Sequence, residues 1–153
     1  MESLERILKE HPFFASFPPE HLQLVTGCAR NHRFKAGEYL FHEGDQADEF
    51  FLVRDGRVAL EIGAPGKAPI VFETVASGSV AGASWLVPPY RWMFDARALE
   101  PARAIGIDAA CLRRKSEADP SLGYVLMKSI LPILVERLQA ARLQILDVYG
   151  RSH

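Results

Sequence analysis

The chain has 153 residues, enough for one hydrophobic core; 48% of them are hydrophobic and 24% are charged, as in ordinary globular proteins. The formal net charge of -1 argues against a nucleic-acid-binding protein, because the excess of cations that phosphate backbones require is missing. No apolar run approaches the length of about 20 residues that spans a bilayer, and the chain start does not have the pattern of a secretory signal. We therefore expect one cytoplasmic domain over residues 1–153, with no membrane association and no direct DNA binding.

The first 30 residues are expected to form short helices. Leu4 and Ile7 follow helical spacing, as do Leu22 and Val25, but several prolines separate the two groups. Pro19 suits the first turn of a helix, where its missing N–H costs nothing. The pattern predicts two short helices within residues 1–30.

Residues 31–108 have the texture of a β-roll. Short runs rich in aromatic and β-branched residues alternate with glycines and Asp-Gly pairs. The clearest turn is Asp55-Gly56, where one-sided apolar alternation before and after the pair predicts a hairpin. Several strands at even spacing indicate a mainly β fold with flanking helices, of the antiparallel jelly-roll (double-stranded β-helix) kind.

Residues 109–149 are expected to be helical. The segment AACLRRKSEA predicts one short helix, and Asp119-Pro120 then offers an N-cap followed by proline at the first helical position. The second helix would be long, roughly 40 Å. We expect Pro132 to kink it and Gly150 to end it.

Two apolar stripes run along this long helix. The first repeats at steps of three and four residues, as in a seam that faces a partner helix. It consists of Leu131, Leu134, Leu138, Ala141, Ile145 and Val148. The second consists of Leu122, Leu126, Ile130 and Ile133. We expect the second stripe to cover the sheet and the first to form a homodimer; the alternative is one wide face buried within the monomer.

The two cysteines, Cys28 and Cys111, stand far apart and neither has a CxxC partner. This spacing argues against a disulfide framework and against a zinc site. The sequence predicts two buried free thiols.

One segment carries a family resemblance. Residues 34–60, FKAGEYLFHEGDQADEFFLVRDGRVAL, resemble the strand-turn-strand signature of cyclic-nucleotide-binding domains, the sensor modules of catabolite-activator-type transcription factors and cyclic-nucleotide-dependent kinases. The positions that fit without a gap are Phe34, Gly37, Glu38, Leu40, Phe41, Gly44, Asp45, Ala47, Asp48, Phe50, Phe51, Val53 and Gly56. The resemblance implies a β-roll followed by a long C-terminal helix, and a regulatory rather than catalytic role.

The family places a phosphate-binding cassette, usually G-E-x-A-L, where this chain reads Gly82-Ala83-Ser84-Trp85-Leu86. The resemblance implies that the backbone of residues 82–84 would face the anionic group of cyclic AMP, cyclic GMP or an altered ligand. Ala83 stands at the place of the glutamate that accepts the ribose hydroxyl, and a methyl group cannot accept a hydrogen bond. We therefore expect weak or absent affinity for cyclic AMP.

Arg91 resembles the arginine that pairs with the cyclic phosphate, yet an ungapped count puts Trp92 at that place. Arg91 reaches the pocket if the Pro88-Pro89 turn is shortened; otherwise it is a solvated or structurally paired arginine. Trp85, Trp92 and a neighbouring large side chain, Met93 or Phe94, bring apolar volume to the same region. They either fill the pocket or form the aromatic walls of a different one.

Three classes of function follow. The first is a regulatory sensor that binds a small ligand, signals through a dimer and acts on a separate output protein, because no winged helix-turn-helix follows the long helix within these residues. The second is a degenerate domain with a filled pocket that acts as a protein-interaction scaffold. The third, a metal-dependent jelly-roll enzyme, requires clustered histidines. The candidates are scattered along the sequence at His11, His21, His32 and His42. We expect no metal, no other cofactor and no catalysis.

Overall fold

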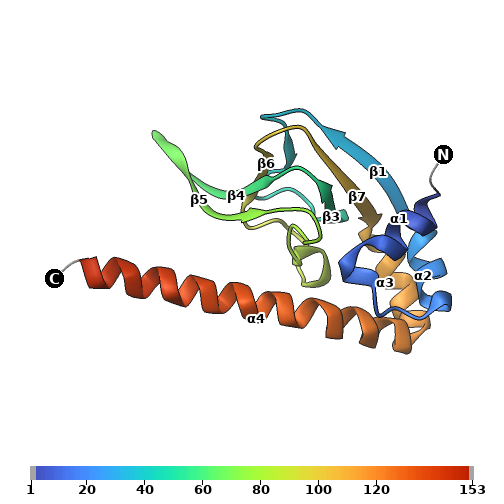
Figure 1. Cartoon of the computed structure of the whole chain (residues 1–153). Coiled ribbons are helices and arrows are strands. Elements are labelled where there is room, and N and C mark those ends of the chain that lie inside the picture. Colours follow the sequence, from blue (N-terminus) through green and yellow to red (C-terminus); the bar gives the residue numbers. More distant parts are fainter. Residues whose placement is uncertain (1–2, 152–153) are drawn as a thin grey trace.

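Two antiparallel sheets form a β-roll at the centre of the molecule (Figure 1). The computed structural model describes residues 3–151. The three-stranded sheet has the order β1-β7-β3 and the four-stranded sheet the order β2-β6-β4-β5. The strands are β1 (Ala29–Phe34), β2 (Tyr39–Phe41), β3 (Glu49–Asp55), β4 (Val58–Ala64), β5 (Lys67–Val75), β6 (Asp95–Ala98) and β7 (Ala102–Asp108). The mainly β jelly-roll fold predicted from the sequence is confirmed.

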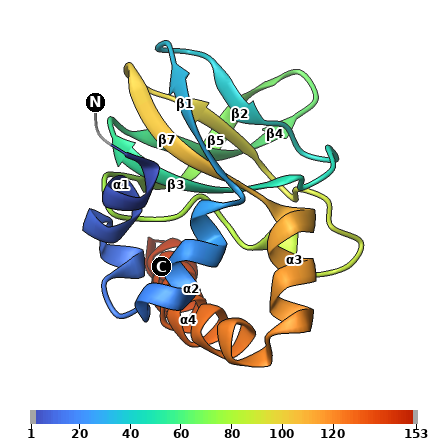
Figure 2. The same cartoon turned by 90° about the vertical axis from the view of Figure 1, so that its right-hand side faces the viewer.

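The helices gather at one end of the roll, and the last of them continues beneath it (Figures 1 and 2). They are α1 (Leu4–Glu10), the 3-10 turn η1 (Pro12–Phe14), α2 (Pro19–Thr26), the 3-10 turn η2 (Ser84–Leu86), α3 (Ala109–Ala118) and α4 (Pro120–Arg151). The two short helices expected before the roll are present, with η1 between them. Within residues 3–151, none of these helices combines the length and the hydropathy needed to cross a membrane.

The turn at Asp55-Gly56 forms, but the hairpin predicted around it is wrong. β3 pairs with β7 in one sheet, whereas β4 pairs with β5 and β6 in the other. The chain crosses between the sheets at Gly56, which has a φ of 86° and whose added Cβ would lie 2.6 Å from the Pro101 carbonyl oxygen. One-sided alternation is common to hairpins and to strands that face each other across a core, so this pattern did not separate them.

The prediction of two free thiols is also wrong, because Cys28 and Cys111 form a disulfide. The bond joins the residue just before β1 to the first turn of α3, with a Cα–Cα distance of 5.9 Å. The backbone N–H of Asp108 donates to the Cys28 carbonyl at 2.8 Å, and the Asp108 side chain caps α3 by accepting from the Cys111 N–H. Pairing of β1 with β7 thus brings the two cysteines together across a separation of 83 residues, which their spacing in the sequence does not reveal.

The long helix α4 forms as predicted but extends further. It includes Pro132 without being divided there, and it continues through Gly150 to Arg151, so Gly150 does not end it. Pro132 therefore costs the helix a hydrogen bond but does not stop it, since neighbouring turns and packing hold both halves.

The second apolar stripe of α4 is the buried one, and the element that this helix contacts most is α3. Leu122, Leu126 and Ile130 are buried in the main core, and Ile133 packs against it partly buried. Beyond this point the helix leaves the core, and most of its apolar side chains are exposed. Only the first half of α4 is thus fastened by hydrophobic burial.

Candidate functional site

The cassette between β5 and β6 approaches the aromatic core closely. Gly82 has a φ of 154°, and a Cβ added there would lie 3.1 Å from Phe94 Cζ and 3.2 Å from Trp92 Cζ3. The helical part of the cassette, η2, is only three residues long. A side chain at residue 82 would therefore be strained by the backbone conformation and would crowd the rings of Phe94 and Trp92.

Trp85 anchors the cassette to the core. Its side chain has no exposed surface, and its ring stacks on Phe50 with centroids 4.8 Å apart. Arg113 of α3 donates to the Trp85 carbonyl at 2.6 Å, and its guanidinium lies 4.1 Å from the centroid of the Tyr90 ring. These contacts fix η2 against α3, so a movement of α3 would shift the cassette with it.

Trp92 fills part of the roll interior. Only 2% of its surface is exposed, and its ring stacks on Phe41 with centroids 3.6 Å apart and planes 5° apart. Its neighbour Arg91 turns to the exterior, where Nη1 donates to the Gly44 carbonyl at 2.9 Å. The two residues thus occupy opposite faces of the strand segment, with the indole inside and the guanidinium outside.

A cleft lies between the roll, the cassette and α4; we call it the helix-side cleft. Its volume is about 390 Å³. Its lining residues are Leu60, Phe72, Glu73, Gly82, Ala83, Ser84, Val87, Met93, Phe94, Leu134, Arg137, Ala140, Ala141 and Gln144. The structure thus brings the predicted residues 82–84 to one cleft, whereas Trp85, Arg91 and Trp92 are not among its lining residues.

Arg137 is a residue of this site that the sequence reasoning missed. Its Nε lies 2.8 Å from a Glu73 carboxylate oxygen, and its Nη2 donates to Ser79 Oγ at 3.3 Å and to the Val80 carbonyl oxygen. Burial lowers the pKa of the Arg137 guanidinium, and the Glu73 carboxylate opposes that effect. A second contact lies two turns further along α4, where the Gln144 amide donates to the Phe72 carbonyl at 3.2 Å.

These polar contacts hold the second half of α4 against β5. A signal was present in the sequence, because Arg137 is one of two arginines that interrupt the apolar texture of the segment ILPILVERLQAARLQIL. It lies on a helix face between the two apolar stripes, where a long cation would be expected to reach a buried acceptor.

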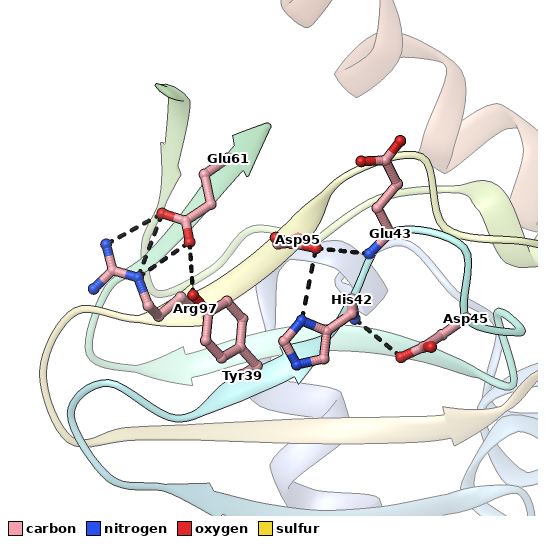
Figure 3. A network of polar contacts seen from close by, with 7 residues as sticks. All are labelled: Tyr39, His42, Glu43, Asp45, Glu61, Asp95 and Arg97. Atoms are coloured by element: carbon pink, nitrogen blue, oxygen red, sulfur yellow. Dashed lines mark hydrogen bonds and ion pairs between the residues drawn. The ribbon is translucent and has the colours of Figure 1, made fainter. Parts of the chain in front are cut away.

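A separate polar network lies on the outer face of the four-stranded sheet (Figure 3). Glu61 of β4 is completely buried, and Arg97 of β6 donates to both of its oxygens, with Nη2 at 3.1 Å from Oε2. The Tyr39 hydroxyl donates to the same carboxylate at 3.2 Å, and burial together with the Glu61 charge raises the pKa of Tyr39. None of these three residues lines the helix-side cleft.

The histidines proposed as metal-ligand candidates lie apart, each with its own partner. His11 contacts the Val53 carbonyl, His21 contacts Ser121, His32 contacts Glu49 and His42 lies near Asp95. Over residues 3–151 there is no group of three or more histidine, cysteine, aspartate or glutamate side chains that could hold a metal ion.

Facing antiparallel sheets, a short cassette over an aromatic core and a long exit helix together define a jelly-roll domain of the ligand-binding type. The model of the cyclic nucleotide-binding domain family matches residues 31–119. The chain belongs to this family, whose members are generally regulatory rather than catalytic.

Solved structures agree with this assignment. A protein from Geobacter metallireducens described as cyclic-nucleotide-binding is 33% identical, with a TM-score of 0.78 over 90% of this chain and 99% of that one. The N-terminal domain of a transcriptional regulator from Streptomyces coelicolor is 22% identical, with a TM-score of 0.68 over 85% and 93% of the two chains. The sensor domain of the regulator DNR from Pseudomonas aeruginosa is 19% identical, with a TM-score of 0.70 over 88% and 91%. The last two likenesses concern the fold alone.

Proposed function

We propose that this chain is the small-molecule-sensing module of a regulatory system, with its ligand in the helix-side cleft and its response carried by α4. The observation that carries the proposal is that three parts of the fold, the roll, the cassette and α4, all contribute residues to the cleft walls. Leu60 and Phe72 come from the roll, residues 82–84 from the cassette, and Leu134 and Ala141 from α4. A ligand between these walls would contact all three parts and would favour the helix position that it binds best.

The response is proposed to pass through a homodimer formed by the first apolar stripe of α4. Leu131, Leu138, Ile145 and Val148 each expose at least half of their surface, so an unpaired chain shows a long apolar strip to water. Leu134 and Ala141 belong to the same stripe and line the cleft. A helix partner on the stripe would therefore sit beside the ligand, and the output would come from a separate protein or from the dimer surface.

A single substitution tests the dimer. Replacing Leu138 by Asp places a charge in the middle of the seam. Light scattering should then report the molar mass of a monomer, whereas the unaltered protein should give the molar mass of a dimer. Leu143 is the matched control, because it is a similarly exposed leucine of α4 outside the seam, and Leu143→Asp should leave the mass at two chains. A single chain mass for the unaltered protein at high micromolar concentration would contradict the seam.

The scaffold alternative is supported by one specific observation, the close stacking of Trp92 on Phe41 in the roll interior. A thermal-shift screen separates the two functions. The sensor predicts that at least one small molecule from a broad metabolite set, with cyclic AMP and cyclic GMP included, raises the melting temperature saturably. The scaffold function predicts that no compound raises the melting temperature. It also predicts that a variant whose cleft is filled by a larger side chain binds the protein partner as well as the unaltered chain does.

A further inference from the structure

We propose that the helix-side cleft takes an uncharged, mainly apolar small molecule, and that it does not take a cyclic nucleotide. This inference rests on the sensor function proposed above and specifies the chemical class of the ligand. It follows from three observations: the apolar side chains that form the walls, the pairing of Arg137 with Glu73, and the burial of Trp92 in the roll interior.

The walls are predominantly apolar. Phe72 and Phe94 pack edge to face with centroids 5.4 Å apart, and Leu60, Leu134 and Ala141 also line the space. The volume of about 390 Å³ lies within the range of about 300–1,000 Å³ typical of small-molecule sites. A ligand that covers these groups gains roughly 25 cal/mol for each Å² of apolar surface removed from water.

The rim of the cleft is also apolar, which favours an apolar ligand. Met93 exposes 76% of its surface and Val87 exposes 62%, although both line the cleft. Exposed apolar side chains at the mouth of a cleft gain free energy when an apolar ligand covers them. A charged ligand would instead have to give up its hydration beside them.

The cleft offers no cation to a phosphate. Of the lysines and arginines in the described residues, Arg137 alone lines it, and its guanidinium is already paired with Glu73 and bonded to Ser79 and Val80. A phosphate that displaced these partners would leave the Glu73 carboxylate unpaired in a partly buried site. Removing one partner of such a pair is costly, so the existing pairing disfavours an anionic ligand.

The two residues that would grip a cyclic nucleotide have been replaced by apolar ones. Ala83 lines the cleft with a methyl group where the family carries its ribose-binding glutamate. Trp92, at the ungapped position of the phosphate-binding arginine, is buried against Phe41, and Arg91 is bonded to Gly44 on the exterior. The Ser84 hydroxyl and the Gln144 amide are the uncharged polar groups left to orient a ligand.

The test uses the full chain and N-phenyl-1-naphthylamine, an uncharged dye whose fluorescence rises in apolar surroundings. We expect saturable binding that a hundredfold excess of cyclic AMP or cyclic GMP does not displace. Ala140→Trp fills the cleft from α4 and should weaken binding at least tenfold. Gln139→Trp adds the same side chain at an exposed position that does not line the cleft, and it should bind the dye like the unaltered protein.

Val87→Asp provides a second variant, because its exposed rim position makes an effect on folding small while it places a carboxylate at the mouth. It should also weaken dye binding, with an unchanged melting temperature. Equal binding by the unaltered chain, Ala140→Trp and Val87→Asp would overturn the proposal. So would binding that disappears as protein concentration rises, since a second copy would then occupy the cleft.

Displacement of the dye by cyclic AMP, or saturable cyclic AMP binding by calorimetry, would overturn the ligand class while leaving the sensor function intact. Failure of the sensor function has a different signature. In that case the dye binds in the cleft but spin labels on α4 and β5 report no change in their distance distribution when it does.

Discussion

At the scale of single residues, the segment of Arg91 and Trp92 places an aromatic ring in the interior and a cation outside. Trp92 stacks on Phe41 and lies within 3.2 Å of a Cβ added at Gly82, so the indole supports the cassette from below. Arg91, one position earlier, points outward. A register difference of one residue therefore decides whether this segment presents a cation or an aromatic ring to the interior.

Replacing Trp92 by Ala should leave a large cavity under the cassette. We expect the free energy of unfolding to fall by about 3–5 kcal/mol, as for other buried aromatic residues truncated to alanine. Urea unfolding measures the change. Met93→Ala is the control: the side chain is largely exposed, and the change there should stay within about 0.5 kcal/mol. If Trp92→Ala lowered the free energy of unfolding as little as Met93→Ala does, the Trp92 ring would not support the cassette.

Glu49 makes folding sensitive to acid. Although partial burial raises its pKa, hydrogen bonds from His32 and Arg30 outweigh burial and lower the pKa to about 2, from an ordinary value of 4.5. A depressed carboxyl pKa stabilises the fold above the ordinary value, and this stability is lost as the pH falls toward the folded value.

The free energy of unfolding should therefore decrease between about pH 5 and pH 2, with Glu49 contributing at most about 3 kcal/mol. Glu49→Gln should lower stability at pH 7 and flatten this part of the profile. Urea unfolding at a series of pH values provides the measurement. A profile of unchanged slope in the variant would assign the acid sensitivity to other carboxylates.

At the scale of elements, α4 has two differently fastened halves. Leu122, Leu126 and Ile130 hold the first half by burial, whereas Arg137 and Gln144 hold the second half by polar contacts to β5 and the cassette loop. Apolar burial fixes an element more firmly than a few polar contacts at a surface, since the contacts compete with water. The second half is therefore the part of the helix most able to change position.

Arg137→Met keeps the length of the side chain but removes its charge and donors. We expect backbone amides of α4 beyond residue 133 to exchange hydrogen about 10–100-fold faster, which corresponds to a loss of about 1.5–3 kcal/mol. Exchange in the first half should not change. Arg142→Met, at an exposed position of the same helix, is the control. Uniformly faster exchange along all of α4 would argue against two separately fastened halves.

At the scale of the whole molecule, the disulfide between Cys28 and Cys111 ties the end of the N-terminal helices to α3. Disulfides that close long loops typically contribute about 2–5 kcal/mol. In urea unfolding under oxidising conditions, the Cys28→Ser, Cys111→Ser double variant should lose free energy of unfolding of this order. Dithiothreitol should lower the free energy of unfolding of the unaltered protein to that of the variant. Insensitivity of the unaltered protein to dithiothreitol would contradict a structural bond. Such bonds are uncommon in reducing compartments, so the expected cytoplasmic location stays a prediction.

The sequence predicted those features whose causes are local. The turn at Asp55-Gly56, the N-cap position before α4 and the buried stripe of its first half all depend on neighbouring residues. The disulfide and the absence of a β3–β4 hairpin depend on which strands pair, and periodicity does not carry that information. Residues 82–84, singled out by the family resemblance, line the helix-side cleft, whereas Arg137 joins them through the path of a helix far along the chain, which no local pattern reveals.

The disulfide also makes the roll a closed covalent ring, since all seven strands of the described residues lie between Cys28 and Cys111. A protease that cuts the β4–β5 tip near Gly66 would leave two pieces that still migrate as one band on a non-reducing gel and separate only when thiol is added. Nicked molecules could therefore keep their architecture, and the tip becomes a natural place to open the polypeptide or insert a reporter sequence.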